Sequence, residues 1–190
     1  MTTYLDELIR AMNLLAENGY LFFGQNTRYG GTSMYHTFKQ LPDSQRIEVP
    51  VFENTQAGMA MGMALEGLKV CDIYPRMDFL IIALNSIINH LDKMEEMSKG
   101  QFEPKVIIRT CVGSVKPLMP GPQHCQNYTE ALKKMVTNID VVELLKTGDI
   151  YPAYEQAVNS DKSTILIEHS DLYNQFLTEE LIKSRKNIIR

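Results

Sequence analysis

A single carboxylate stands where a short apolar strand is expected to give way to a helix. The stretch from Arg46 to Gly67 reads RIEVPVFENTQAGMAMGMALEG, and Glu53 lies at the junction. Flanked by Val51, Phe52 and the apolar face of the helix, this carboxylate would be partly removed from water, which disfavours its charged form. Such a group is suited to holding or relaying a proton. The alternative is an ordinary first-turn acid, stabilised by the helix N-terminus by about 0.3–1 kcal/mol.

The helix that follows Glu53 contains two interior glycines. Gly58 and Gly62 are four residues apart, so they lie on one face of the helix. An interior glycine costs about 1 kcal/mol of helix stability relative to alanine. We interpret the pair as the place where another backbone approaches closely, and the methionines between them as packing residues rather than ligands.

Short strands alternate along the chain with helices that would position Glu53. Strands are expected at 20–23, 47–51, 69–74, 105–110, 140–144 and 164–168. Helices are expected between Thr3 and Gly19 and at 54–66, 78–99, 128–135 and 151–159. This alternation predicts an α/β fold with a doubly wound, mostly parallel sheet covered by helices on both faces. Ligands bind such sheets beyond the carboxyl ends of the strands.

Length and composition indicate one globular unit. The chain has 190 residues, 44% of them hydrophobic, enough for a single core. We therefore expect one α/β domain at 1–175 and a C-terminal tail at 176–190 that can form a helix. Because 19 basic and 23 acidic residues give a net charge of −4 without long single-sign blocks, no nucleic-acid or membrane partner is expected.

The cysteines and the N-terminus point to a reducing compartment. The three cysteines have neither the number nor the spacing of a disulfide framework or a zinc site, so reduced thiols are expected. The first ten residues, MTTYLDELIR, lack the basic end and apolar run of a signal peptide. We therefore expect a cytoplasmic protein.

Two adjoining segments carry a resemblance to a known family. ENTQAGMAMGMALEGLKV, followed directly by CDIYPRMDFLIIALNSIIN, resembles the pyrimidine-binding domain of transketolase-like thiamine diphosphate enzymes. The resemblance is strongest to the β subunits of two-component 2-oxo-acid dehydrogenases. Those subunits share the Glu, the small-residue helix, the strand, and an Asn/Asp-Phe pair that opens a helix ending in Ile-Asn. Gly24-Gln25-Asn26 is similar to the family's Gly-Glu-Asp/Glu turn, and the Pro122–Gln126 segment to its Gln-His-Ser-Gln loop.

The resemblance implies roles for four residues. Glu53 falls on the glutamate that hydrogen-bonds a ring nitrogen of the aminopyrimidine of thiamine diphosphate. Phe79 falls on the aromatic residue that packs against this ring, and Gln25 replaces an acidic residue beside it. His124 falls on a loop histidine that faces the substrate. Judged without the resemblance, Phe79 is more often core and His124 more often a surface imidazole.

The resemblance also implies a partner chain. The family binds Mg²⁺ and the diphosphate through Gly-Asp-Gly followed by Asn, on a separate domain. Here Gly148-Asp149-Ile150 lacks the second glycine, so we expect a diphosphate-binding, α-like subunit to hold Mg²⁺ and share the cofactor in a hetero-oligomer. Family β subunits continue into a further domain, so the chain is expected to be either a single-domain subunit or a truncated one.

The expected activity is that of an enzyme subunit. Decarboxylation of a 2-oxo acid with acyl transfer, of the dehydrogenase type, matches the resemblance best. A split transketolase acting on ketoses and a non-oxidative decarboxylase or synthase remain alternatives. A catalytically silent structural or regulatory subunit is an alternative from a different class.

Overall fold

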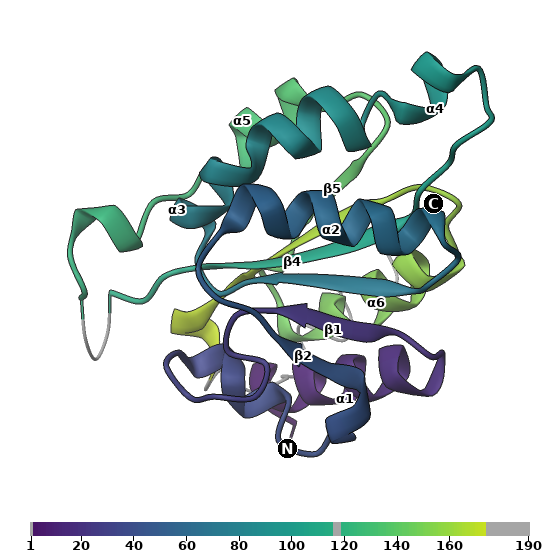
Figure 1. The fold of residues 1–190 in the computed structure, drawn as a ribbon. Helices are drawn as coiled ribbons and strands as arrows, with labels where there is room; N and C mark the ends of the chain where they lie inside the picture. Colours follow the sequence, from purple (N-terminus) through teal and green to yellow (C-terminus); the bar gives the residue numbers. More distant parts are fainter. Residues whose placement is uncertain (1, 116–118, 174–190) are drawn as a thin grey trace.

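One parallel sheet organises the protein. The computed structural model describes residues 2–115 and 119–173, and these form a six-stranded sheet in the order β2-β1-β3-β4-β6-β5. Its strands are β1 (Leu21–Gly24), β2 (Arg46–Glu48), β3 (Val70–Tyr74), β4 (Val106–Val112), β5 (Asp140–Glu143) and β6 (Thr164–His169). Every neighbouring pair is parallel (Figure 1). The predicted fold class is confirmed, while the expected tail at 176–190 lies outside the described residues.

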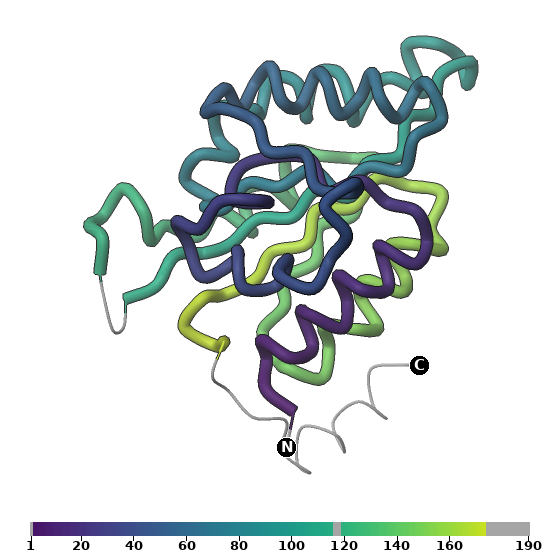
Figure 2. Tube along the Cα trace, turned by 60° about the horizontal axis from the view of Figure 1, so that its bottom comes forward, coloured from purple at the N-terminus to yellow at the C-terminus, as the bar shows by residue number. Residues whose placement is uncertain are grey.

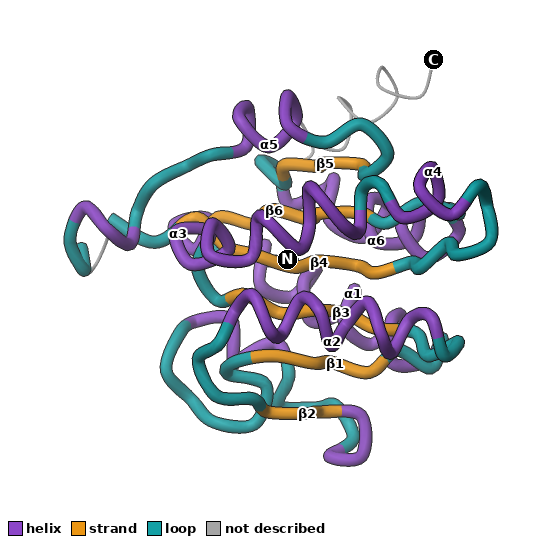
Figure 3. Tube along the Cα trace, turned by 45° about the horizontal axis from the view of Figure 1, so that its top comes forward, coloured by secondary structure: helices purple, strands orange, loops and turns teal. Residues whose placement is uncertain are grey.

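Helices cover both faces of the sheet. Helices α1 (Tyr4–Glu17) and α6 (Ile150–Asn159) lie side by side on one face (Figure 2). The other face carries α2 (Glu53–Leu65), α3 (Met77–Leu80) and α5 (Thr129–Met135) (Figure 3), and α4 (Met94–Ser98) follows α3. The remaining turns of helix are η1 (Ser33–Thr37), η2 (Asp43–Gln45), η3 (Ile81–Ala83), η4 (Asn85–Leu91), η5 (Pro122–His124), η6 (Thr147–Asp149) and η7 (Ser170–Leu172). No helix in the described ranges is long and apolar enough to cross a membrane.

Helix α1 forms as its sequence predicts. The Thr3 hydroxyl accepts a hydrogen bond from the Asp6 backbone N–H (3.1 Å), and the Asp6 carboxylate accepts one from the Thr3 N–H (2.8 Å). This reciprocal cap satisfies two N–H groups that the helix itself cannot pair. Leu8, Met12 and Leu15 are buried on one side, which matches the helical spacing of apolar residues.

The helix predicted at 78–99 is not one regular helix. Its first part, 77–91, changes pitch from α3 through η3 to the π-helical η4, and a turn at 92–93 separates it from α4. Asp92 lies at the break. Its backbone N–H donates to Ile87 O, five residues back (2.9 Å), and its carboxylate accepts from the N–H groups of Thr137 (2.9 Å) and Asn138 (2.7 Å). Because Thr137 and Asn138 lie far along the chain from Asp92, local periodicity does not reveal the break.

Strand β2 is shorter than predicted. It ends at Glu48 rather than at Val51. The Val49 N–H still donates to Gly24 O (3.1 Å), but Pro50 has no N–H and cannot continue the ladder.

The sheet order creates a switch point between β1 and β3. From β1 the chain moves outward to β2, then returns through α2 to β3 on the other side of β1. Gly24 ends β1 with φ +147°, and a Cβ there would lie 2.3 Å from Ile73 O. Glycine therefore permits the close approach of the two strand ends. In doubly wound sheets this crevice is where ligands bind.

Candidate functional site

Glu53 is buried at the switch point. It is the first residue of α2 and only 3% exposed, in agreement with the desolvation predicted for it. The Gln25 side-chain amide, just beyond β1, donates to Glu53 Oε1 at 3.2 Å. The Tyr74 hydroxyl, at the end of β3, lies 3.3 Å from the Glu53 backbone oxygen. The ends of β1 and β3 therefore position this glutamate.

A second buried carboxyl group supports the start of α2. Asp72 on β3 accepts hydrogen bonds from Gln56 Nε2 (2.6 Å) and from the Tyr74 hydroxyl (2.8 Å). Burial raises the pKa of Asp72 to about 7, although both hydrogen bonds lower it. Because Tyr74 also contacts Glu53, the two acids share a neighbour. Asp72 was not among the predicted site residues, although an Asp inside the apolar strand VCDIY was a visible signal.

His124 and Phe79 form a second contact of the candidate site. Their rings meet edge to face, with centroids 5.3 Å apart and planes at 88°. Arg76 Nη1 donates to the His124 backbone oxygen at 3.1 Å, and the Gln126 N–H donates to Asp78 Oδ1 at 3.3 Å. His124 Nδ1 is buried and makes no hydrogen bond within the described part of the chain. These contacts hold η5 against α3.

Gly113 permits the close approach of the His124 loop. A Cβ at Gly113 would lie 1.8 Å from the His124 backbone oxygen and 2.4 Å from Arg76 Nη1. Any larger residue would displace one of them.

The four predicted site residues therefore form two contacts, Gln25 with Glu53 and Phe79 with His124. Both pairs attach to the end of β3, the first through Tyr74 and the second through Arg76. Their roles in binding a cofactor stay predictions. Arg76 was not among the predicted site residues, although a lone arginine in the turn after a buried strand was a visible signal.

Glu48 organises the loop after β1. Its carboxylate accepts hydrogen bonds from the N–H groups of Asn26 (2.8 Å) and Arg28 (2.7 Å) and from the Thr27 hydroxyl (3.1 Å). Asn26 has φ +59°, a conformation that asparagine tolerates better than most residues. The loop that carries Gln25 is thus bound to the end of β2.

Metal-binding potential is low in this part of the protein. Within residues 2–115 and 119–173, no three His, Cys, Asp or Glu side chains are grouped so that they could hold a metal ion. Cys71, Cys111 and Cys125 are free thiols. His169 Nε2 pairs with Glu143 Oε1 at 2.9 Å.

The parallel sheet, its switch point and the buried glutamate there define a class of α/β proteins that bind ligands at the strand ends. Residues 3–175 match the family described as "Transketolase, pyrimidine binding domain". The chain belongs to this family, which confirms the resemblance found in the sequence.

Curated relatives carry names of enzyme subunits. One, "Pyruvate dehydrogenase E1 component subunit beta-3, chloroplastic" from Oryza sativa subsp. japonica, is 30% identical over 157 residues, which cover 80% of this chain and 39% of that protein. Another, "Pyruvate dehydrogenase E1 component subunit beta" from Chaetosphaeridium globosum, is 30% identical over 159 residues, covering 82% and 47%. The chain therefore spans less than half the length of these relatives.

Solved structures share the fold at low sequence identity. A split-gene transketolase, described as an inactive β4 tetramer, matches with a TM-score of 0.68 at 12% identity, covering 93% of this chain and 53% of that one. Benzoylformate decarboxylase from Polynucleobacter necessarius matches with a TM-score of 0.65 at 14% identity, covering 94% and 32%. At these identities the likeness supports the fold alone.

Proposed function

We propose that this chain is the pyrimidine-half subunit of a thiamine diphosphate-dependent enzyme that decarboxylates a 2-oxo acid and transfers the acyl group. The observation that carries the proposal is Glu53, a carboxylate that is buried at the switch point and has one side-chain partner, Gln25, among the described residues. The relatives' names, pyruvate dehydrogenase E1 subunits β, support the dehydrogenase type of reaction.

The residues present fit the aminopyrimidine half of the cofactor. Glu53 Oε1 is paired with Gln25, whereas Oε2 makes no hydrogen bond to a described residue and is available to a ring nitrogen. Phe79 is half-buried and offers an aromatic surface. When bound, thiamine diphosphate supplies the electron sink for cleaving a bond next to a carbonyl.

The chain's own residues would orient the reactants and manage protons. Glu53 holds a proton at Oε2 against the ring nitrogen, and Gln25 orients its carboxylate. His124 has a buried, unpaired Nδ1 in the described structure, so its imidazole has hydrogen-bonding capacity left for the substrate carboxylate. Edge-to-face packing on Phe79 fixes the direction of that imidazole.

A partner chain completes the proposed site. We propose an α-like subunit that holds the diphosphate and Mg²⁺, in a cytoplasmic hetero-oligomer. A Cβ added at Gly58 or Gly62 would meet nothing within 4 Å, so the backbone approach expected there is not made by the described part of this chain. Met59 between them is 46% exposed. Helix α2 thus presents an open face on which a second chain can pack closely.

The proposal is tested by reconstitution. The chain is combined with a protein that carries Gly-Asp-Gly and a downstream Asn, and reduction of an artificial electron acceptor is measured with a panel of 2-oxo acids. Turnover that requires thiamine diphosphate is the expected result. A complex that forms and binds the cofactor, but turns over neither 2-oxo acids nor ketoses, would instead indicate a silent subunit and contradict the proposal.

A further inference from the structure

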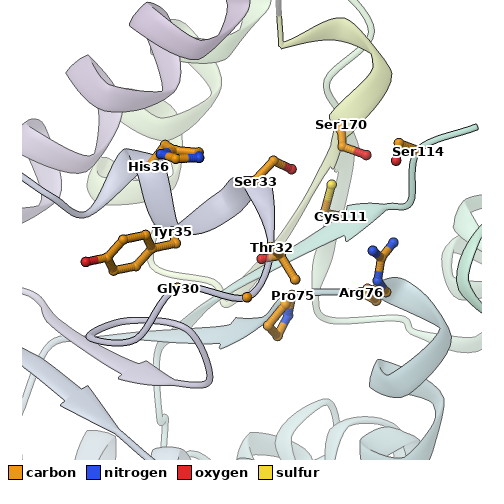
Figure 4. Close-up of a pocket in the computed structure, with 11 residues that line it drawn as sticks. Gly30, Thr32, Ser33, Tyr35, His36, Pro75, Arg76, Cys111, Ser114 and Ser170 are labelled. Carbon is orange, nitrogen blue, oxygen red and sulfur yellow. The ribbon is translucent and has the colours of Figure 1, made fainter. Parts of the chain in front are cut away.

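A cavity of about 550 Å³ opens at the carboxyl edge of the sheet. Its wall comes from the segments that follow β1, β3, β4 and β6, which are represented by Ser33, Arg76, Ser114 and Ser170 (Figure 4). No Asp or Glu is among the described residues that line it. A wall whose described residues include an arginine, several hydroxyl groups and no carboxylate favours an anionic ligand.

Arg76 provides the cation. Its Nη1 donates to the His124 backbone oxygen (3.1 Å), while its Nε and Nη2 make no hydrogen bond to any described residue. Figure 4 shows the guanidinium directed toward the region of Cys111 and Ser114. A guanidinium with free donors pairs well with the two oxygens of a carboxylate or phosphate.

Hydroxyl groups surround the space that the guanidinium faces. Ser33 and Ser170 extend into the same region of Figure 4, from segments that follow β1 and β6. Ser170 already donates to Val112 O (3.2 Å), whereas Thr32 Oγ1, also in the wall, is buried without a partner among the described residues. The wall therefore has polar groups beyond those that its own fold satisfies.

We infer that this cavity binds an anionic group at the end of the substrate remote from the reacting carbonyl, and that Arg76 is the residue that pairs with it. This inference rests on the proposed function. Arg76 contacts His124 through its backbone oxygen, whereas the His124 ring lies against Phe79. An anion on Arg76 and a carbonyl facing the His124 ring therefore occupy different places. The substrate class is a 2-oxo acid or ketose that carries a distal carboxylate or phosphate.

A binding experiment with the full chain tests the cavity without catalysis. Glutarate and inorganic phosphate, added separately, should raise the melting temperature, because a ligand that binds only the folded state stabilises it. Arg76→Met should abolish the increase. Arg10→Met is the matched control, because Arg10 lies on α1 and outside the cavity wall. If Arg76→Met fails to fold, Arg76→Lys and Ser33→Ala should each weaken the increase.

The binding outcomes are decisive in either direction. An increase with one anion only identifies the group as a carboxylate or a phosphate. No increase with either anion, or an equal increase in wild type and Arg76 variants, overturns the inference.

A kinetic experiment with the reconstituted complex tests the substrate class. Arg76→Met should lower kcat/KM for 2-oxoglutarate or fructose 6-phosphate by about 10- to 100-fold, mainly through KM, as expected for one charged hydrogen-bonding partner. The counterparts that lack the distal anionic group, 2-oxopentanoate and fructose, should change much less. Equal losses for substrates with and without the distal anionic group overturn the inference and leave the proposed function standing. Absence of all turnover defeats the proposed function, while the melting experiment still decides about the cavity.

Discussion

Glu53 and Glu168 are both buried, yet their surroundings differ. Glu168 is fully buried, and its carboxylate accepts hydrogen bonds from Arg109 Nε (3.1 Å), Arg109 Nη2 (2.8 Å) and the Tyr173 hydroxyl (2.5 Å). Within the described residues, the Glu53 carboxylate accepts one side-chain hydrogen bond, at 3.2 Å from Gln25. A fully paired buried charge has its hydrogen-bonding needs met by the fold, whereas an incompletely paired one can serve a ligand.

The Glu168 pair also explains how the sheet supports the cavity. Arg109 Nη1 donates to the Thr37 hydroxyl (2.8 Å), and its guanidinium lies 5.0 Å from the Phe38 ring centroid. Through Arg109, the β4–β6 pair is joined to η1 and the residue after it, and η1 includes Ser33 of the cavity wall. The paired glutamate therefore belongs to the framework, and the incompletely paired one to the candidate site.

The largest effect is expected at Glu53. Glu53→Gln should lower kcat of the reconstituted enzyme by about 10²–10⁴-fold, because an amide cannot hold the transferred proton. Stability in urea should change by less than about 1 kcal/mol, since only one hydrogen bond is at stake. Steady-state kinetics and urea unfolding measure both, with the exposed Glu155→Gln as control. Full activity in Glu53→Gln would remove the assignment.

At Glu168, unlike at Glu53, a large loss of stability is expected. Glu168→Gln leaves the Arg109 guanidinium buried without a counter-charge, so the free energy of unfolding should fall by about 3–5 kcal/mol. Urea denaturation monitored by circular dichroism measures this loss. A change below about 1 kcal/mol would show that the two glutamates do not differ in the way their contacts indicate.

Asp72 lies between these two cases, because its two side-chain hydrogen bonds only partly offset the effect of burial on its carboxylate. Its folded pKa of about 7 lies above the ordinary Asp value, so the folded state binds the proton more tightly than the unfolded state. This contribution to stability is complete below about pH 4 and is lost as pH rises through about 7, with a slope of up to about 1.4 kcal/mol per pH unit. Asp72→Asn should remove this slope from the free energy of unfolding, measured in urea between about pH 4 and 7. Identical slopes in both proteins would contradict the assignment.

The smallest effect is expected at Gln25. Gln25→Leu removes the one side-chain donor that Glu53 has among the described residues. Without it the carboxylate is less well oriented, so the activation free energy should rise by about 1 kcal/mol and kcat should fall several-fold. Gln25→Glu would place a second carboxylate beside Glu53 and should shift the acidic limb of the pH–rate profile upward, because two adjacent carboxylates do not both ionise readily. An unchanged profile in Gln25→Glu would show that this contact does not influence the reaction.

Sequence patterns predicted most of the fold because they reflect interactions over a few residues. Apolar spacing and the Thr3 cap located α1, and short apolar runs located the six strands to within a few residues. The pattern failed where distant groups intervene. Asp92 breaks the helix at 78–99 through partners about 45 residues away, and no local feature of the helix encodes them.

The sequence by itself determined the α/β class, the family and the identity of Glu53, Phe79, His124 and Gln25 as candidates. Only the tertiary structure decided which of them touch and which groups surround them. The Gln25–Glu53 contact spans 28 residues, Arg76–His124 spans 48 and Arg109–Glu168 spans 59. Such contacts depend on the order and register of the parallel strands, which bring the carboxyl ends of distant segments to one edge of the sheet.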